Sequence, residues 1–167
     1  MFSKFFPDAT SKSTYSIDFE KLYEKGIRGL LFDIDNTLVP HGAPADERAI
    51  ELFERLRKIG FKSCFLSNNQ IQRVASFNEK IGERFIENAH KPAVGNYKKA
   101  MELLGTDCSN TVFIGDQLFT DIYGAKRTGI HNILVKPIHP KEEIQIVLKR
   151  YLERIVLYFY RKEEGTL

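Results

Sequence analysis

Short apolar runs alternate along this chain with longer segments in which apolar residues recur every three or four positions. The short runs predict five strands, over residues 27–34, 61–66, 84–87, 111–114 and 130–135. The longer segments predict helices over residues 45–59, 70–79, 92–104 and 119–128. Strands that alternate with helices in this order are typical of a mainly parallel sheet covered on both faces, so we expect an α/β fold of three layers.

Helix ends and chain ends refine this prediction. Gly60 is placed to end the helix over residues 45–59, and Pro92 suits the first turn of the helix that it opens. Pro140 is expected to open a long final helix over residues 140–162, whereas residues 1–16 are expected to form a loosely held arm. Because no linker or internal repeat divides the chain, we expect one domain over residues 1–167.

Composition and charge narrow the class of protein. The chain is 43% hydrophobic and 28% charged, as globular proteins are, and no apolar run approaches the ~20 residues that span a membrane. Cys64 and Cys108 have no metal-type spacing and the first residues do not form a signal peptide, so we expect a cytoplasmic protein. The net charge of +3 is mild and does not indicate a nucleic-acid partner.

Polar residues gather after the expected strands, where ligands bind in sheets of this kind. Two aspartates and a threonine follow the first strand, a serine and two asparagines follow the second, and two more aspartates follow the fourth, with a lysine before the third helix. These residues are Asp33, Asp35, Thr37, Ser67, Asn68, Asn69, Lys91, Asp116 and Asp121. We expect them to form one site.

Four carboxylates that converge at one sheet edge repel each other unless a cation lies among them. Mg²⁺ suits such an all-oxygen site, because it takes few protein ligands and completes its shell with water and phosphate oxygens. Lys91, Ser67 and Thr37 can bind the other phosphoryl oxygens. One aspartate can act as a covalent nucleophile, and an acid two residues further on can protonate the leaving oxygen and then activate water. The set predicts a magnesium-dependent phosphatase.

The segments DIDNT, SNN, HKP and GDQLFTD, in this order over residues 27–136, resemble the four motifs of the haloacid dehalogenase (HAD) phosphatase superfamily. The resemblance implies the Rossmann-like HAD fold and an aspartyl-phosphate intermediate. It implies that Asp33 is the nucleophile and a metal ligand, and that Asp35 is the general acid and base and binds the metal through its backbone carbonyl. Asn36 stands where the family often has glycine, and asparagine tolerates unusual backbone angles.

The resemblance also implies roles for the other motif residues. Five residues are expected to contact the substrate: Thr37, which also supports its loop, Ser67, Asn68, Asn69 and Arg73. Arg73, one turn into its helix, could equally be an exposed surface arginine. Lys91 would neutralise charge on the nucleophile and the phosphoryl oxygens. Asp116 would be a direct metal ligand, and Asp121 would hold a metal-bound water or orient Lys91.

Spacing around the motifs leaves no room for an inserted cap domain. About thirty residues separate Thr37 from Ser67 and about twenty separate Asn69 from Lys91, and ordinary helices and strands use both stretches. We therefore expect a capless, open site. Such a site favours a phosphate carried on something large: a protein, a nucleic acid end or a lipid headgroup.

Within the superfamily, FDIDNTLVPH, SNNQIQRV and HKP together resemble the YqeG-like subgroup of class IIIA, which is similar to mitochondrial phosphatidylglycerophosphate phosphatases. The resemblance implies that the substrate is phosphatidylglycerophosphate. A phosphoprotein or a nucleic acid end stays open as an alternative substrate. A non-catalytic regulatory protein on the same fold is a third hypothesis, against which the intact pair Asp33 and Asp35 argues. The sequence leaves the oligomeric state open.

The final helix bears on the question of a lipid substrate. One apolar stripe is expected to pack on the sheet and consists of Ile144, Val147, Leu148, Tyr151, Leu152, Ile155 and Phe159. Further aromatic residues and flanking lysines and arginines also suit a bilayer interface, so peripheral contact at the inner face of the membrane stays open beside a subunit contact. Phe2, Phe5 and Phe6 are expected to dock on the body of the protein.

Overall fold

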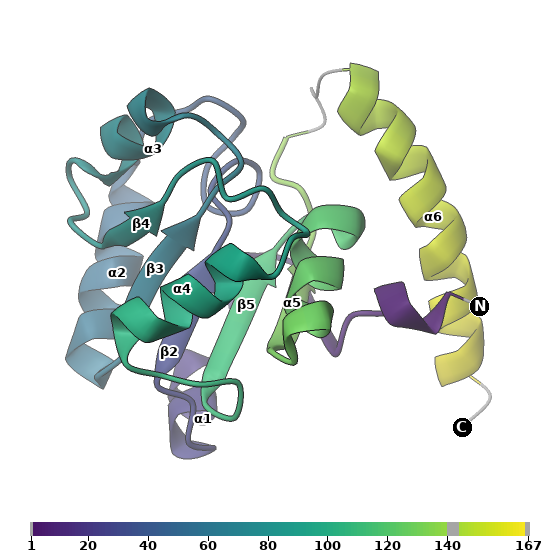
Figure 1. Ribbon diagram of the computed structural model, residues 1–167, viewed down its shortest axis with the longest axis horizontal. Helices are drawn as coiled ribbons and strands as arrows, with labels where there is room; N and C mark the ends of the chain where they lie inside the picture. The colour runs from purple at the N-terminus through teal and green to yellow at the C-terminus, as the bar shows by residue number, and fades with distance from the viewer. Residues whose placement is uncertain (1, 140–143, 166–167) are drawn as a thin grey trace.

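Over residues 2–139 and 144–165, which the computed structural model describes, the chain forms a six-stranded sheet in which every strand pairing is parallel (Figure 1). The order across the sheet is β1-β6-β5-β2-β3-β4. The strands are β1 (Ala9–Ser11), β2 (Gly29–Phe32), β3 (Lys62–Leu66), β4 (Arg84–Ile86), β5 (Thr111–Gly115) and β6 (His131–Val135). The expected α/β class and parallel sheet are confirmed.

The expectation of five strands was one strand short, because β1 lies inside the arm that was expected to be loosely held. Ala9 pairs with Ile133 and Ser11 with Val135. Just before β1, the backbone N–H of Asp8 donates to Asn132 Oδ1 at 3.0 Å, and Asn132 Nδ2 donates to Asp8 Oδ2 at 2.7 Å. A three-residue edge strand is too short to be recognised by an alternating pattern in the sequence, so backbone pairing that only the folded sheet supplies decides its structure.

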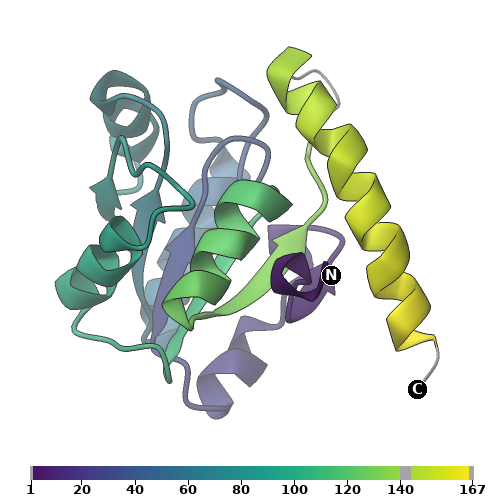
Figure 2. The ribbon, with the colours of Figure 1, turned by 45° about the vertical axis from the view of Figure 1, so that its right-hand side comes forward.

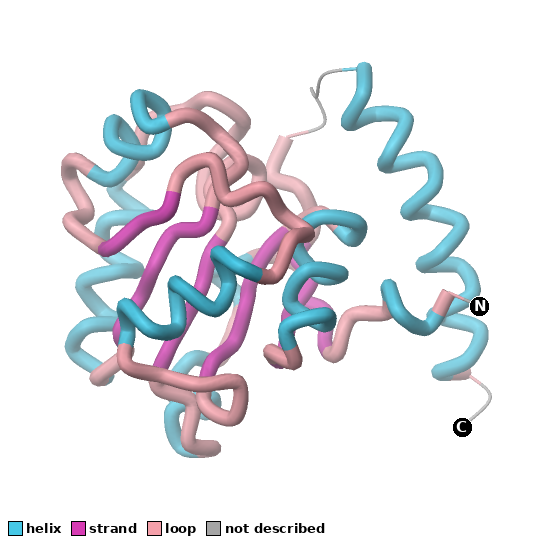
Figure 3. The backbone as a smooth tube through the Cα atoms, viewed as in Figure 1, coloured by secondary structure: helices cyan, strands magenta, loops and turns pink. Residues whose placement is uncertain are grey.

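Helices cover both faces of the sheet (Figure 3). They are α1 (Phe19–Glu24), α2 (Glu47–Ile59), α3 (Ile71–Asn78), α4 (Gly95–Leu104) and α5 (Tyr123–Thr128). The helix α6 (Ile144–Glu164) stands to one side of the sheet (Figure 1), and the short turns are η1 (Ser3–Phe5), η2 (Thr14–Ser16) and the π-helical η3 (Leu118–Ile122). Alternate side chains of the central strand β2 pack in different hydrophobic cores. Leu30 and Phe32 pack in the core that includes α1, α2 and α3, and Leu31 packs in the core that includes α4 and α5. A strand buried on both faces is hydrophobic throughout, which is why its sequence has no polar alternation.

Several helix boundaries differ from expectation. The helix before Gly60 is confirmed as α2: Asp46 caps its start by accepting from the Ala49 N–H at 2.8 Å, and Gly60 ends it at φ 116°. Pro92 lies in a turn before α4, which begins at Gly95, so its expected place in the first helical turn was wrong. The helix expected over residues 119–128 is divided into η3 and α5, and α1 was not expected.

The orientation expected for the final helix was wrong. The helix α6 runs along one side of the molecule (Figure 2). Its residues Glu153 and Val156 are buried, whereas the apolar stripe expected to pack on the sheet is exposed. Its members on the described side chains are 40–65% exposed: Val147, Leu148, Tyr151, Leu152, Ile155 and Phe159. Hydrogen bonds from the buried side set this orientation, since the Leu118 N–H donates to Glu153 Oε1 at 2.8 Å. Pro140 and the expected start of the helix lie outside the described residues.

The N-terminal aromatic residues dock on the body of the protein, as expected. The ring of Phe2 stacks on Phe159 with centroids 5.5 Å apart, and Phe5 contacts Phe119 edge-on at 5.1 Å. Phe6 contacts Tyr160 at 5.2 Å. Among residues 2–139 and 144–165, no helix is both long and apolar enough to cross a membrane.

Candidate active site

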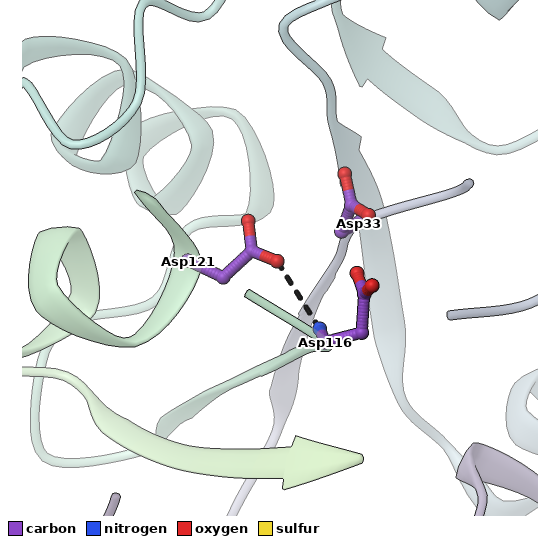
Figure 4. A group of neighbouring side chains, drawn as sticks. All are labelled: Asp33, Asp116 and Asp121. Atoms are coloured by element: carbon purple, nitrogen blue, oxygen red, sulfur yellow. Dashed lines mark hydrogen bonds between the residues drawn. The ribbon is translucent and has the colours of Figure 1, made fainter. Parts of the chain in front are cut away.

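Three buried carboxylates lie together at the carboxyl ends of the central strands (Figure 4). Asp33 follows β2, Asp116 follows β5, and Asp121 lies in η3. One oxygen from each lies within 4.8 Å of the others. Because Phe32 and Ile114 are register partners, the chains that leave β2 and β5 place Asp33 beside Asp116. The expected convergence of these three residues is present; Asp35 is not one of the group.

Lys91 lies between two of these carboxylates. Its buried Nζ is 2.8 Å from Asp33 Oδ1 and 2.6 Å from Asp121 Oδ1. The backbone of Lys91 is fixed by Asn68, whose Oδ1 accepts from the Lys91 N–H at 2.8 Å and whose Nδ2 donates to the Lys91 carbonyl at 3.3 Å. Asn68, expected to contact substrate, is therefore engaged in holding Lys91.

Asp121 joins Lys91 to the loop after β5. Its second oxygen, Oδ2, accepts from the backbone N–H groups of Asp116 at 3.2 Å and Gln117 at 3.1 Å. A Cβ at position 115 would lie 2.4 Å from this oxygen, so glycine is needed for the approach of Asp121. Both carboxylate oxygens of Asp121 thus have partners inside the protein. This arrangement suits a residue that orients Lys91 better than one that binds the metal directly.

The loop that carries Asp33 is held from both sides. Thr37 Oγ1 lies 3.0 Å from Asp116 Oδ1 and 3.3 Å from Asp33 Oδ2, and shares its one hydrogen between them. Asn36 has a left-handed φ of 61°, and its N–H donates to the Val39 carbonyl at 2.7 Å. Asparagine accepts this conformation, as expected.

The N-terminal segment supports the same loop, which the sequence did not predict. Thr14 Oγ1 donates to the Thr37 carbonyl at 2.8 Å, and the Tyr15 hydroxyl donates to the Leu38 carbonyl at 2.6 Å. Nothing in the polar run around these residues indicates long-range contacts, because a hydroxyl that bonds a distant carbonyl leaves no periodic signal.

The Asp35 carboxylate is turned toward α3. Its Oδ1 accepts from Arg73 Nη2 at 2.8 Å and from the Gly42 N–H at 2.8 Å, and its Oδ2 accepts from Asn69 Nδ2 at 2.6 Å. Arg73 and Asn69, both expected to contact substrate, are therefore partners of Asp35. Arg73 is not a free surface arginine, since its side chain is only 19% exposed.

Ser67 is fully buried at the end of β3. Its hydroxyl accepts from the backbone N–H of Asn69 at 3.1 Å and from Asn69 Nδ2 at 3.2 Å. Because both bonds use the oxygen as acceptor, the hydroxyl hydrogen can be donated to a phosphoryl oxygen. Ser67 does not cap α3, since the N-cap of that helix is Gln70.

Burial and mutual repulsion disfavour the charged forms of the carboxylates in the acidic group. Burial raises the pKa of Asp33 to about 6; the Lys91 ammonium opposes that rise and Asp121 adds to it. Burial and the neighbouring Asp33 raise the pKa of Asp116 well above its usual range. Although burial lowers the pKa of Lys91, the Asp121 and Asp33 carboxylates raise it, so Lys91 is charged. Buried oxygen donors that resist ionisation fit a hard divalent cation.

Two residues of α6 complete the surroundings of Asp116, and the sequence did not indicate them as site residues. The Arg150 guanidinium forms an ion pair with the Asp116 carboxylate and donates to the Asp116 carbonyl. Buried Glu153 lies 3.0 Å from Arg150 Nη1. Oppositely charged residues three apart on a helix are typical of an exposed helix surface, so the pattern gave no sign that these two are inside.

The site has no cap domain over the stretch from β2 to β5, all of which the structure describes. Only α2 lies between β2 and β3, and only α3, β4 and α4 lie between β3 and β5. The expected capless architecture is confirmed.

Fold and site together define a class of protein. The HAD-hydrolase-like family matches residues 88–143 of the chain. A relative from Bacillus subtilis (strain 168) is 41% identical over 162 residues, which cover 94% of this chain and 92% of the relative. The chain therefore belongs to the HAD-like phosphatases, which generally use a divalent metal. The Bacillus relative is named probable phosphatase YqeG.

Two further similarities are more distant. Phosphatidylglycerophosphate phosphatase 1, chloroplastic/mitochondrial, of Arabidopsis thaliana is 28% identical over 166 residues, which cover 93% of this chain and 47% of that protein. The crystal structure of an uncharacterized protein from Listeria monocytogenes serotype 4b matches with a TM-score of 0.56 at 20% identity, over 71% of this chain and 85% of that one. The structural likeness agrees with the HAD/Rossmann-like α/β fold.

Proposed function

We propose that this protein is a Mg²⁺-dependent phosphomonoesterase that works through an aspartyl-phosphate on Asp33. The carboxylates of Asp33 and Asp116 and the backbone carbonyl of Asp35 would hold the cation, with Asp121 behind them. When bound, the cation neutralises these carboxylates and withdraws charge from the phosphoryl oxygens. The observation that carries the proposal is the buried Lys91 ammonium between Asp33 and Asp121, with Asp116 beside them.

The side chains divide the reaction between two carboxylates. Asp33 attacks phosphorus, the ester P–O bond breaks, and Asp35 gives its proton to the leaving oxygen. Asp35 then accepts a proton from the water that attacks phosphorus, and the P–O bond to Asp33 breaks. Inorganic phosphate leaves, and both carboxylates return to their starting states. Lys91 and Ser67 bind phosphoryl oxygens, while Arg73 and Asn69 position Asp35.

An aryl phosphate tests this chemistry without reference to the natural substrate. Phosphate release from p-nitrophenyl phosphate is expected to require Mg²⁺ and to fall by at least about 10³-fold in Asp33→Asn, because the variant has no nucleophile. Asp18→Asn is the matched control, since asparagine also caps α1. Full activity in Asp33→Asn would contradict the mechanism. Lack of activity in the wild type would favour a non-catalytic protein.

The proposed substrate is phosphatidylglycerophosphate. Support comes from the similarity to the Arabidopsis phosphatase named for that lipid and from the capless site, which can admit a phosphate at a surface. Phosphate release is to be compared among phosphatidylglycerophosphate micelles, phosphopeptides and phosphorylated oligonucleotides. Fastest release from the micelles is expected. Rapid turnover of a peptide or an oligonucleotide, with none of the lipid, would replace this substrate by one of the alternatives.

The outer stripe of α6 is proposed to contact the bilayer that holds this lipid. We use this name for the exposed residues Leu148, Tyr151, Leu152, Ile155, Tyr158 and Phe159. Aromatic and aliphatic side chains with basic neighbours, here Lys149 and Lys162, are typical of helices that lie in a membrane interface. The basic neighbours favour a bilayer that contains anionic lipid.

Vesicle sedimentation tests this contact. Wild-type protein is expected to sediment with vesicles that contain phosphatidylglycerol, and the double variant Leu148→Ser/Leu152→Ser is expected to remain in the supernatant. Leu103→Ser is the control, because Leu103 is an exposed leucine on α4. A dimer that the double variant disrupts, with no vesicle binding by the wild type, would assign the stripe to a subunit contact.

A further inference from the structure

A cavity of about 740 Å³ lies between α6 and the sheet edge formed by β1 and β6. Its lining includes the last residues of β1, the end of β6 and one side of α6, together with Asp116 of the candidate active site. The cavity therefore adjoins the acidic group. Its volume lies within the range of about 300–1,000 Å³ typical of small-molecule sites.

Five cationic side chains line this cavity: Arg150, which pairs with Asp116, and four others, Lys12, Lys136, Arg154 and Arg161. Ser11 and Val135 are register partners, so Lys12 and Lys136 leave neighbouring strands side by side. Arg154 and Arg161 are seven residues apart on α6 and so lie on the same side of the helix. Within residues 2–139 and 144–165, none of these four side chains has a hydrogen bond or an ion pair.

The three carboxylates of the lining offset only part of this positive charge, because five cationic side chains line the same cavity. Asp116 and Glu153 both pair with Arg150. Glu164 Oε1 accepts from the Tyr160 hydroxyl at 2.6 Å. Like charges that face one concave space raise its potential, and an anion there would be attracted by all four. The cavity is thus suited to a negatively charged ligand.

Apolar side chains form other parts of the wall, among them Leu134, Val135, Pro137 and Leu157. Free phosphate would gain nothing from these surfaces, whereas a ligand with both an anionic group and hydrocarbon would use both kinds of wall. Because Asp116 belongs to both sites, one molecule can lie in the cavity and reach the acidic group.

We propose that this cavity binds the phosphodiester of the substrate and the hydrocarbon next to it, while the terminal phosphomonoester reacts at Asp33. The proposal rests on the proposed function, since phosphatidylglycerophosphate carries both phosphate groups in one molecule. Arg154 and Arg161 then determine specificity: they distinguish a lipid with a second, non-reacting phosphate from a simple phosphomonoester.

Direct binding tests the cavity independently of turnover. Calorimetric titration with dihexanoylphosphatidylglycerol, a phosphodiester with short hydrocarbon chains, is expected to show saturable binding to the wild type. Binding is expected to weaken at least tenfold in Arg154→Gln/Arg161→Gln. Lys58→Gln is the control, because Lys58 is an exposed cation of α2 that neither lines the cavity nor adjoins the outer stripe. Glycerophosphoglycerol, which has the diester without the chains, is expected to bind more weakly.

Kinetics separate this proposal from the proposed function. In the double variant, the KM for micellar phosphatidylglycerophosphate is expected to rise at least tenfold more than the KM for p-nitrophenyl phosphate. If the wild type hydrolyses the aryl phosphate but not the lipid, the proposed substrate is wrong, and the titration still decides what the cavity binds. No binding of the diester lipid by the wild type, or equal binding by wild type and double variant, would overturn the cavity proposal.

Discussion

Arg150 on α6 forms an ion pair with Asp116 at the end of β5 and also donates to the Asp116 carbonyl oxygen. This pair connects the final helix of the described chain to the candidate active site across 34 residues of sequence. A divalent cation bound as proposed would use the same carboxylate as the guanidinium, so the two would compete for it.

Arg150→Gln is therefore expected to have opposite effects with and without metal. In EDTA, the variant should lose about 1–3 kcal/mol of the free energy of unfolding, because Asp116 is left buried without its cation. The Mg²⁺ concentration that gives half of the metal-induced rise in Tm should fall. Urea unfolding and Mg²⁺ titration measure the two effects. Arg55→Gln is the control, because Arg55 forms an exposed ion pair with Glu20. Weaker Mg²⁺ binding by Arg150→Gln than by the wild type would show that Arg150 and the cation do not compete.

The raised pKa of Asp33 predicts how stability depends on pH in the absence of metal. Burial raises that pKa from 3.8 to about 6, so the folded state binds the proton more tightly than the unfolded state. Protonation of Asp33 therefore stabilises the folded state by up to about 3 kcal/mol. This contribution is fully present below about pH 4 and is lost as the pH rises through about 6. Asp33→Asn should therefore be more stable than the wild type at pH 8 in EDTA, and the difference should vanish toward pH 4.

Asp107 is the control for this prediction, because its pKa is shifted in the opposite direction. Hydrogen bonds from Ser109 lower the pKa of exposed Asp107, so its contribution is present above pH 4 and is lost on acidification. Asp107→Asn should thus be no more stable than the wild type at pH 8. Thermal unfolding from pH 4 to pH 8 checks both variants. An Asp33→Asn variant that is less stable at every pH would mean that burial of this carboxylate carries no penalty.

Lys91 is expected to matter to both stability and activity. Lys91→Met leaves Asp33 and Asp121 buried without their cation, which should cost about 3–5 kcal/mol and lower kcat by at least about 100-fold. Adding Asp121→Asn should recover part of the stability but not the activity, since the lost charges are coupled. Lys126→Met, which breaks an exposed pair with Asp8, should cost less than about 1 kcal/mol. Strict additivity of the two site variants would contradict the coupling.

The contact between Tyr15 and the loop of the nucleophile predicts a local effect. Tyr15→Phe removes the donor to the Leu38 carbonyl and should cost about 1 kcal/mol of stability. Amide exchange at residues 36–39 should accelerate, because the loop loses one of its supports. Tyr158→Phe, on the exposed side of α6, is the control and should leave exchange there unchanged. Unchanged exchange in Tyr15→Phe would show that the N-terminal segment does not hold this loop.

Local patterns were enough to predict the class of fold and the three members of the acidic group, although the fourth carboxylate expected there, Asp35, is turned toward α3. The run from Leu30 to Phe32 is apolar at every position because both faces of β2 are covered, and Asp33 and Asp116 follow partnered strands that end at one edge. The sequence predicted the places of these two residues correctly because the ends of strands follow from short-range signals. No such signal predicts that Asn68 holds Lys91, or that Asn69 and Arg73 hold Asp35.

What the sequence determined by itself was therefore the sheet, its direction and the chemistry at the ends of its strands. Tertiary structure alone decided that residues 9–11 form a strand, that Tyr15 supports a loop far along the chain, and that α6 turns Glu153 inward and its apolar stripe outward. The physical reason is the same in each case. Periodicity shows that a helix has two unlike faces, but only the partners available in the folded chain, here the Leu118 N–H for Glu153 and the Asp116 carboxylate for Arg150, decide which face is buried.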